Sequence, residues 1–355
     1  MKRLKSFFLL AILVCVCQAS FAQMISNDYY SWGKVHFDEK DYAQAVECFQ
    51  KGAEQGDPRA QCYLGFCFQL GYGVTRDPQK AVEWYRKAAN QHFALAQESL
   101  GECYDDGDGV QKDPEEAVKW YKEAAFQKDA VAQYHLGLHY MSGLAVKKDI
   151  QKAAQLYQKS AEQGYVEAQY QLGLCYFNGL GVEKNLQNAL TWCQKAAEQG
   201  YDEAQYELGK CYFYGIGVSK NLQEAAMWFK KAAELDNAEA QCAMGLCYVQ
   251  GLGVAQDNNI AAKWFLKSAK QGNADAQYSM GLLYLNSSNE PQKAIQWFQM
   301  AAEQGYADAQ NNLGYCYLNG IGVNKDLKEA EKWFQKAAAQ GNTKAKENLE
   351  ELHKQ

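Results

Sequence analysis

Apolar residues recur along this chain in two alternating helical patterns. A first segment carries Ala at position 1, Leu or Met at 5, Gly at 6 and an aromatic residue at 9. A second segment carries Ala at position 22, aromatic residues at 25 and 26, and small residues at 29 and 30, with Lys and Glu between them. Such spacing is typical of amphipathic helices. The pattern therefore predicts pairs of helices, here termed helix A and helix B, joined by short loops.

The helix pair repeats with a nearly fixed period. Eight copies begin at residues 60, 96, 132, 168, 204, 240, 276 and 309. Seven of these starts lie 36 residues apart, the last step is 33, and a truncated ninth copy begins at Ala345. A period of this length indicates a solenoid, in which each unit buries its apolar face against its neighbours.

Glycine occupies position 6 of helix A in all eight copies, for example Gly209. Glycine inside a helix costs about 1 kcal/mol relative to alanine, so its recurrence predicts close packing, with the large aromatic residue of helix B over the missing side chain. The loop Gly215–Val218 is expected to end helix A where a positive φ is needed. Because no strand precedes this loop and no Lys-Ser/Thr follows it, a phosphate-binding loop is not expected.

These residues resemble the Sel-1-like repeat family, a relative of the tetratricopeptide repeat. In the fifth copy the residues that match are Ala204, Leu208, Gly209, Tyr212, Gly215, Gly217, Val218, Ala225, Trp228, Lys231, Ala232 and Ala233. The resemblance implies an all-α fold, a right-handed α/α superhelix of helix-turn-helix repeats. It assigns eight Sel-1-like repeats to residues 60–344, a tetratricopeptide-like capping repeat to residues 23–59 and a C-terminal capping helix to residues 345–355. The third copy departs from the pattern, with Ala145 for a loop glycine and Leu156 for Trp.

The first 22 residues have the order of a secretory signal peptide. Lys2, Arg3 and Lys5 precede an apolar run from Phe7 to Cys17, and Ser20-Phe21-Ala22 offers small residues for cleavage. A run this short does not span a bilayer, and no later transmembrane segment is expected. The sequence thus predicts a periplasmic or secreted protein, with a bacterial periplasm favoured.

The charge balance bears on possible partners. The chain has a net charge of −6, and removal of residues 1–22, which carry three positive charges and no negative one, would leave −9. Without a basic cluster, nucleic acid is not an expected partner, since contacts to phosphates dominate that affinity.

Ten cysteines follow the predicted signal peptide. Six share position 8 of helix A, namely Cys67, Cys103, Cys175, Cys211, Cys247 and Cys316. Equivalent atoms of stacked helix pairs lie about 9–10 Å apart, beyond the reach of about 7 Å for a disulfide. Small buried residues are therefore favoured, although bridges from Cys62 to Cys67, or from Cys48 to a neighbour, remain open. The pattern contains no paired CxxC or histidine cluster, so neither a metal site nor a cofactor is expected.

An enzymatic alternative rests on Ser31. Some secreted relatives of the Sel-1-like family are described as penicillin-binding or weak β-lactamase proteins, and Ser31-Trp32-Gly33-Lys34 fits S-x-x-K. The companion Lys-Thr-Gly and Ser-Asp-Asn motifs are missing, and Trp32 and Gly33 occupy packing positions. His135 and His139 fall at ordinary helix A positions with no clustered carboxylate and nucleophile. We therefore expect no catalytic residue.

Resemblance to tetratricopeptide arrays places helix A on the concave face, with positions 3, 7 and 10 toward the groove. The candidate binding residues are Tyr134, Leu138 and Met141, Tyr170, Leu174 and Phe177, Tyr206, Lys210 and Phe213, and Tyr278, Leu282 and Leu285. Tight superhelical packing would bury part of this stripe without any ligand, and that alternative stays open. In the second copy Glu98, Glu102 and Asp105 form an acidic groove end.

The predicted function is a protein–protein interaction adaptor that binds a partner protein or an extended peptide in its concave groove. Aromatic anchors would supply affinity and flanking charges would set partner choice. Two alternatives remain. One is a structural scaffold of an envelope or secretion complex, which would bind through its convex face. The other is the penicillin-binding type of enzyme. The oligomeric state is not encoded in these patterns.

Overall fold

The computed structural model describes residues 28–286 and 290–354. Within these ranges the chain forms nineteen helices and no strand. The helices that open each hairpin are α2 (Tyr29–Asp38), α4 (Pro58–Leu70), α6 (Ala94–Asp106), α8 (Ala130–Ser142), α10 (Val166–Asn178), α12 (Asp202–Tyr214), α14 (Ala238–Gln250), α16 (Ala274–Asn286) and α18 (Ala307–Asn319). Their partners are α3 (Tyr42–Glu54), α5 (Pro78–Ala89), α7 (Pro114–Phe126), α9 (Ile150–Glu162), α11 (Leu186–Glu198), α13 (Leu222–Glu234), α15 (Asn258–Lys270), α17 (Pro291–Glu303) and α19 (Leu327–Ala339). Helix α20 (Thr343–Leu352) follows.

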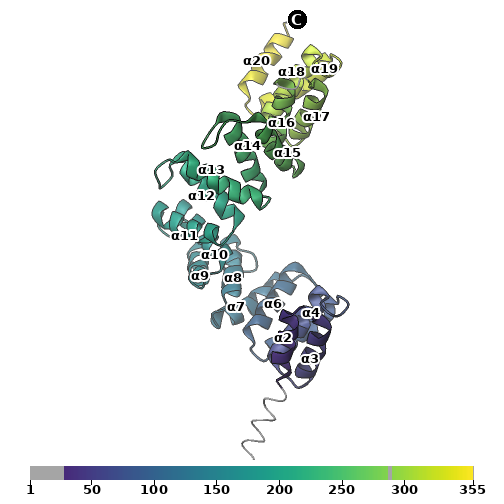
Figure 1. Cartoon of the computed structure of the whole chain (residues 1–355), viewed down its shortest axis with the longest axis vertical. Coiled ribbons are helices and arrows are strands. Elements are labelled where there is room, and N and C mark those ends of the chain that lie inside the picture. The colour runs from purple at the N-terminus through teal and green to yellow at the C-terminus, as the bar shows by residue number, and fades with distance from the viewer. Residues whose placement is uncertain (1–27, 287–289, 355) are drawn as a thin grey trace, which may run out of the picture. The chain divides into compact units, whose positions relative to one another are not determined.

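The fold is an all-α solenoid of helix hairpins, as the repeat predicts. It consists of two compact units. The first runs to Cys175 and includes Gly179–Glu183, and the second comprises Tyr176–Asn178 and the residues from Lys184 onward. Consecutive helices pack together from α2 to α9 in the first unit and from α11 to α20 in the second (Figure 1). The predicted signal peptide, residues 1–22, lies outside the described residues.

Short polar and glycine residues set the ends of the helices. The Asp113 carboxylate accepts hydrogen bonds from the backbone N–H groups of Glu115 and Glu116 at the start of α7, where Pro114 takes the first position. Gly215 ends α12 at φ +75°, and its N–H donates to the carbonyl of Cys211. This is the left-handed end that the loop pattern predicts.

The third repeat departs from the loop pattern in its backbone as well as in its sequence. Ala145 stands where six other loops have their second glycine, and it adopts φ +59°. A side chain in this region costs about 1–2 kcal/mol because its Cβ approaches the following carbonyl oxygen. The backbone at Ala145 therefore adopts the same positive φ as the glycine of other loops, although alanine disfavours it.

The glycine at position 6 makes room for an aromatic ring of helix B. A Cβ placed on Gly209 would lie 2.5 Å from Cδ1 of Phe229, and one on Gly101 would lie 2.6 Å from Cε1 of Tyr121. Carbon atoms in contact normally stay about 3.5–4.0 Å apart. The close packing predicted from the recurring glycine is confirmed, and it presses helix A onto helix B in each of these hairpins.

Buried glutamines connect successive helices. The Nε2 atom of Gln241, which is fully buried, donates to the carbonyl of Ala233, and its Oε1 atom accepts a hydrogen bond of 2.9 Å from Nε2 of Gln271. The same arrangement recurs at Gln61, Gln97, Gln133, Gln277 and Gln310. Buried polar groups are costly unless they are paired, so this ladder fixes the register between helices.

Within the described part of the chain, the repeat of Gln205 lacks the second hydrogen bond of this ladder. Gln205 donates to the carbonyl of Ala197, but its buried Oε1 atom has no hydrogen-bond partner among the described residues. The position that supplies the glutamine in other repeats holds Leu235 here. A single substitution therefore leaves an acceptor unsatisfied in this repeat.

All ten cysteines in the described ranges are free, and every one except Cys48 is buried. The six at position 8 of helix A lie in the core, as predicted. Burial raises the pKa of these thiols, to about 12 for Cys67 and Cys103. High thiol pKa values disfavour the reactive thiolate. Among the described helices, none is long and apolar enough to cross a membrane.

Candidate binding groove

The twelve candidate groove residues all lie on A helices and are all partly exposed. They are Tyr134, Leu138 and Met141 on α8, Tyr170, Leu174 and Phe177 on α10, Tyr206, Lys210 and Phe213 on α12, and Tyr278, Leu282 and Leu285 on α16. Their intermediate burial means that packing between helices covers only part of each side chain. The remaining surface faces away from the core.

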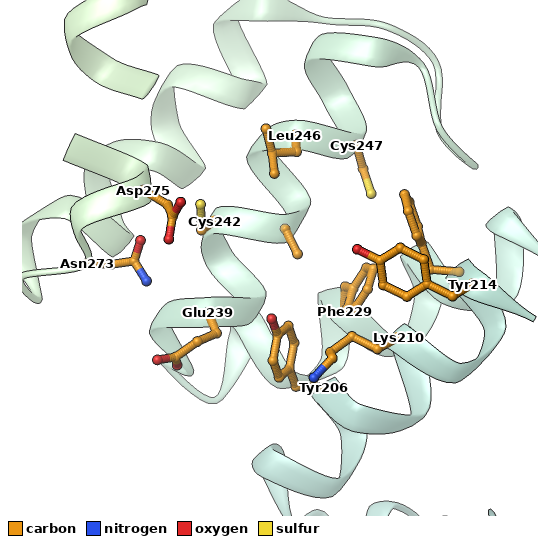
Figure 2. A pocket seen from close by; sticks show the side chains of 12 residues that line it. Tyr206, Lys210, Tyr214, Phe229, Glu239, Cys242, Leu246, Cys247, Asn273 and Asp275 are labelled. Carbon is orange, nitrogen blue, oxygen red and sulfur yellow. The ribbon is translucent and has the colours of Figure 1, made fainter. Parts of the chain in front are cut away.

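Three of the twelve candidates meet in one groove of the second unit. Tyr206, Lys210 and Phe213 line a cavity of about 220 Å³ between α12 and α14. Figure 2 shows Tyr206, Lys210 and Tyr214 of α12 facing Cys242 and Leu246 of α14. Phe229 forms the floor from α13, and Asn273 and Asp275 add polar groups beside the start of α16.

The ring of Tyr206 lies 5.7 Å from that of Phe229. The Nζ atom of Lys210 lies 5.2 Å from the centre of the Tyr206 ring and 2.7 Å from the Glu207 carboxylate. Burial is the main reason that the pKa of Tyr206 rises to about 12, so this hydroxyl is neutral. The groove therefore combines aromatic walls with a charged edge.

The other candidates do not enter this cavity. Tyr278, Leu282 and Leu285 pack against the core cluster formed by α17 and α18, and the Tyr278 ring lies 5.2 Å from that of Tyr306. On α8, the Tyr134 ring lies 5.2 Å from that of Tyr165. In these two repeats packing within the solenoid accounts for much of the apolar stripe.

A second cavity, of about 350 Å³, lies in the first unit among α2, α4 and α6. Phe37, Tyr63 and Phe66 form its apolar wall, and the acidic candidates Glu98 and Glu102 line it from α6. The third acidic candidate, Asp105, does not line this cavity. The structure thus joins the acidic groove end to an aromatic groove that the sequence analysis did not single out.

Both histidines of α8 lie against carboxylates of α6, a proximity between repeats that the sequence analysis did not predict. His135 Nε2 is 3.4 Å from Glu102 Oε1, and His139 Nε2 is 2.8 Å from Asp105 Oδ2. His139 Nδ1 also lies 3.0 Å from the carbonyl oxygen of Leu144. Both ring nitrogens of His139 therefore have an oxygen within hydrogen-bond distance, which fixes the orientation of the buried ring.

The geometry at Ser31 does not resemble a catalytic pair. The Ser31 hydroxyl donates to Asp28 Oδ2 at 2.6 Å, and the Asp28 carboxylate caps α2. The Lys34 ammonium pairs with the Asp38 carboxylate one helical turn further along α2. Each member of the S-x-x-K match therefore has its own acidic partner, and hydrogen bonding to Ser31 lowers the pKa of Asp28.

Some groove residues were not named in the sequence analysis, although they fit its rule that positions 3, 7 and 10 of helix A face the groove. Cys242 and Leu246 occupy positions 3 and 7 of helix A in the sixth repeat, and Phe66 occupies position 7 in the first. Applying the rule to every repeat would have named them. Tyr214 follows position 10 at the end of α12, and no periodic signal identifies it.

A solenoid of helix hairpins with grooves along its A helices defines a repeat scaffold for protein interactions. The chain belongs to the Sel1 repeat family. The family model matches residues 25–57, 58–93, 94–128, 130–165, 166–201, 202–237, 238–273, 274–306 and 307–342. The first match falls on the segment for which the sequence predicts a tetratricopeptide-like cap. Sel1 repeat solenoids are generally non-enzymatic.

Two solved bacterial structures are similar to the chain. One is c5321, a protective antigen present in uropathogenic Escherichia coli strains with an SLR fold, which is 37% identical with a TM-score of 0.79 over 91% of this chain and 71% of that chain. The other is a Sel1 repeat protein from Oxalobacter formigenes, which is 34% identical with a TM-score of 0.63 over 86% of this chain and 89% of that one. No curated protein is significantly similar in sequence.

Proposed function

We propose that this protein is a periplasmic or secreted adaptor that binds a partner protein or an extended peptide in the groove between α12 and α14. The observation that carries the proposal is the exposed apolar surface there. Tyr214 is 65% exposed and Leu246 is 43% exposed, beside the half-buried rings of Tyr206 and Phe213. An exposed apolar surface of this kind on a folded protein marks an interaction site.

The charges of the groove restrict the partner. Lys210 already has the Glu207 carboxylate as a partner, whereas Glu239 and Asp275 bring two further carboxylates to the groove. A segment with an aromatic or large aliphatic side chain next to a lysine or arginine fits this surface. Aromatic contact would supply most of the affinity, and the charges would set register and raise the rate of association.

Substitution of the two exposed groove residues tests the proposal. The protein with Tyr214→Ser and Leu246→Ser is compared with wild type in capture from envelope extract, after both are shown to melt cooperatively. The matched control carries Met227→Ser and Met300→Ser, because these are similarly exposed apolar residues, 41% and 45%, on the B helices α13 and α17.

Groove binding predicts that a partner captured by wild type and by the control is lost by the groove variant. If the control variant loses the partner and the groove variant keeps it, binding occurs through the B-helix face. That result would favour the structural scaffold of an envelope or secretion complex.

Location outside the cytoplasm is the second part of the proposal. It rests on the basic, apolar and small-residue order of residues 1–22, and the description of the E. coli relative as a protective antigen agrees with it. Cell fractionation and N-terminal sequencing test it. A mature protein that begins at Gln23 in the periplasm or medium supports the proposal, and an intact chain in the cytoplasm contradicts it.

A further inference from the structure

Glu98, Glu102 and His135 bring together three potential ligand atoms, all within 4.8 Å of one another. The two glutamates lie one turn apart on α6, and the histidine comes from α8 in the next repeat. Ligands bound at about 2.0–2.2 Å in a tetrahedral zinc site lie about 3.3–3.6 Å apart. His135 Nε2 and Glu102 Oε1 are already 3.4 Å apart, and side-chain rotations of about 1 Å would let all three groups share one ion.

From this geometry we propose that Glu98, Glu102 and His135 form a binding site for a divalent transition-metal ion of the zinc type. Two carboxylates and one imidazole are donors that such ions accept, and three protein ligands leave a coordination position open. Glu98 and Glu102 also line the cavity of about 350 Å³ in the first unit. The open position would face this groove, where water or a side chain of a partner completes the coordination.

Burial and charge in the cluster favour a cation. Glu98 is 95% buried, and its carboxylate shares this buried position with Glu102 one helical turn away. Asp129, at the start of α8, adds a third carboxylate to the field of the two glutamates. A bound dication would offset the negative charge that these carboxylates bring together.

Tyr121 positions the histidine of the cluster. Its ring lies between Gly101 and His135, stacked on the imidazole with ring centres 5.1 Å apart. Its hydroxyl is fully buried and has no hydrogen-bond partner within the described ranges. The Tyr157 hydroxyl of the next hairpin is unpaired within these ranges as well, so the feature that concerns the cluster is the stacked ring. Stacking holds the plane of the His135 imidazole, as the surroundings of a metal-binding histidine do.

Zinc titration of the metal-stripped, purified chain tests the proposal, with magnesium as the comparison ion. Isothermal titration calorimetry is expected to show one zinc ion per chain, and magnesium is expected to bind far more weakly because it prefers oxygen ligands and keeps its waters. Glu98→Gln, Glu102→Gln and His135→Gln are each expected to lower the zinc affinity by more than about 100-fold, beyond the 10–100-fold typical of outer-shell changes.

Two further variants separate the metal site from general effects on the fold. Glu207→Gln is the matched control, a helix A glutamate of another repeat, and is expected to bind zinc as wild type does. Tyr121→Phe keeps the ring that stacks on His135 and is expected to bind zinc as wild type does, while the metal-free protein keeps or raises its melting temperature, because an unsatisfied hydroxyl is removed.

Two results would overturn the proposal. One is a titration with no saturable one-to-one zinc binding. The other is equal zinc affinity in wild type, Glu98→Gln and His135→Gln, each shown by circular dichroism to be folded. The site does not involve the groove between α12 and α14, so loss of zinc binding and loss of partner binding are separate outcomes.

Discussion

The contact between Gly209 and Phe229 allows a quantitative test of how helix A is pressed onto helix B. A Cβ on Gly209 would lie 2.5 Å from Cδ1 and 2.6 Å from Cε1 of Phe229, so the ring must retreat by about 1 Å to reach a normal carbon contact. Phe229 is only 3% exposed and packs among Ala225, Ala232 and Met244, which leave little room.

The expected cost of Gly209→Ala is the balance of two terms. Overpacking in a filled core costs about 1–3 kcal/mol, while alanine gains about 1 kcal/mol over glycine in helix propensity. We therefore expect a net destabilisation of about 1 kcal/mol. In a chain that carries Phe229→Leu the ring edge is gone, so the same alanine is expected to stabilise by about 1 kcal/mol.

Urea unfolding followed by circular dichroism measures all four proteins of this double-mutant cycle, with the slope on urea checked for constancy. The packing argument predicts a coupling free energy between the two sites of about 1–3 kcal/mol. If Gly209→Ala stabilises the protein with Phe229 intact, or if the two substitutions are additive, the recurring glycine is not explained by close packing.

Three further substitutions test other features of the repeats. Leu235→Gln supplies the missing donor for Gln205 Oε1, and we expect it to raise the free energy of unfolding by about 1 kcal/mol in the same urea assay. The reason is that a buried unpaired acceptor costs about 1–3 kcal/mol. An unchanged free energy of unfolding would mean that the glutamine ladder does not contribute to stability. Ala145→Gly relieves a side chain at φ +59° and should raise the melting temperature, whereas an unchanged or lower value would contradict strain in that loop. Glu98→Gln, in buffer with chelator, should flatten the dependence of stability on pH. The pKa of Glu98 is raised in the folded state, so the folded wild-type chain binds more protons than the unfolded chain. Wild type therefore loses stability as pH rises above 4.5. Equal pH profiles of unfolding for the two proteins would refute this.

Features that recur at fixed positions of the repeat were predictable from sequence, because the period itself carries the information. The glycine over the aromatic ring of helix B and the buried cysteines at position 8, such as Gly209 and Cys211, followed from residues that recur at fixed positions. The half-burial of the candidate groove residues also fits their placement on helix A, but which of them share a cavity depends on how neighbouring hairpins pack.

Contacts between different repeats were the ones that sequence reasoning missed. Glu102 and His135 are 33 residues apart, and they meet because position 7 of one helix A faces position 4 of the next. Periodicity within a repeat does not reveal this relation between repeats. The hydrogen bond from Gln241 to the carbonyl of Ala233 was missed for the same reason, since Ala233 belongs to the preceding repeat.

The most direct test of the account is photo-crosslinking from the groove in living cells. A photoreactive amino acid is placed at Tyr214, the exposed residue at the end of α12, and separately at Met300 on the outer surface of α17. The account predicts that the same partner is crosslinked from position 214 and not from position 300. Crosslinks from position 300 alone would show that the partner binds the B-helix face, and would contradict a binding groove between α12 and α14.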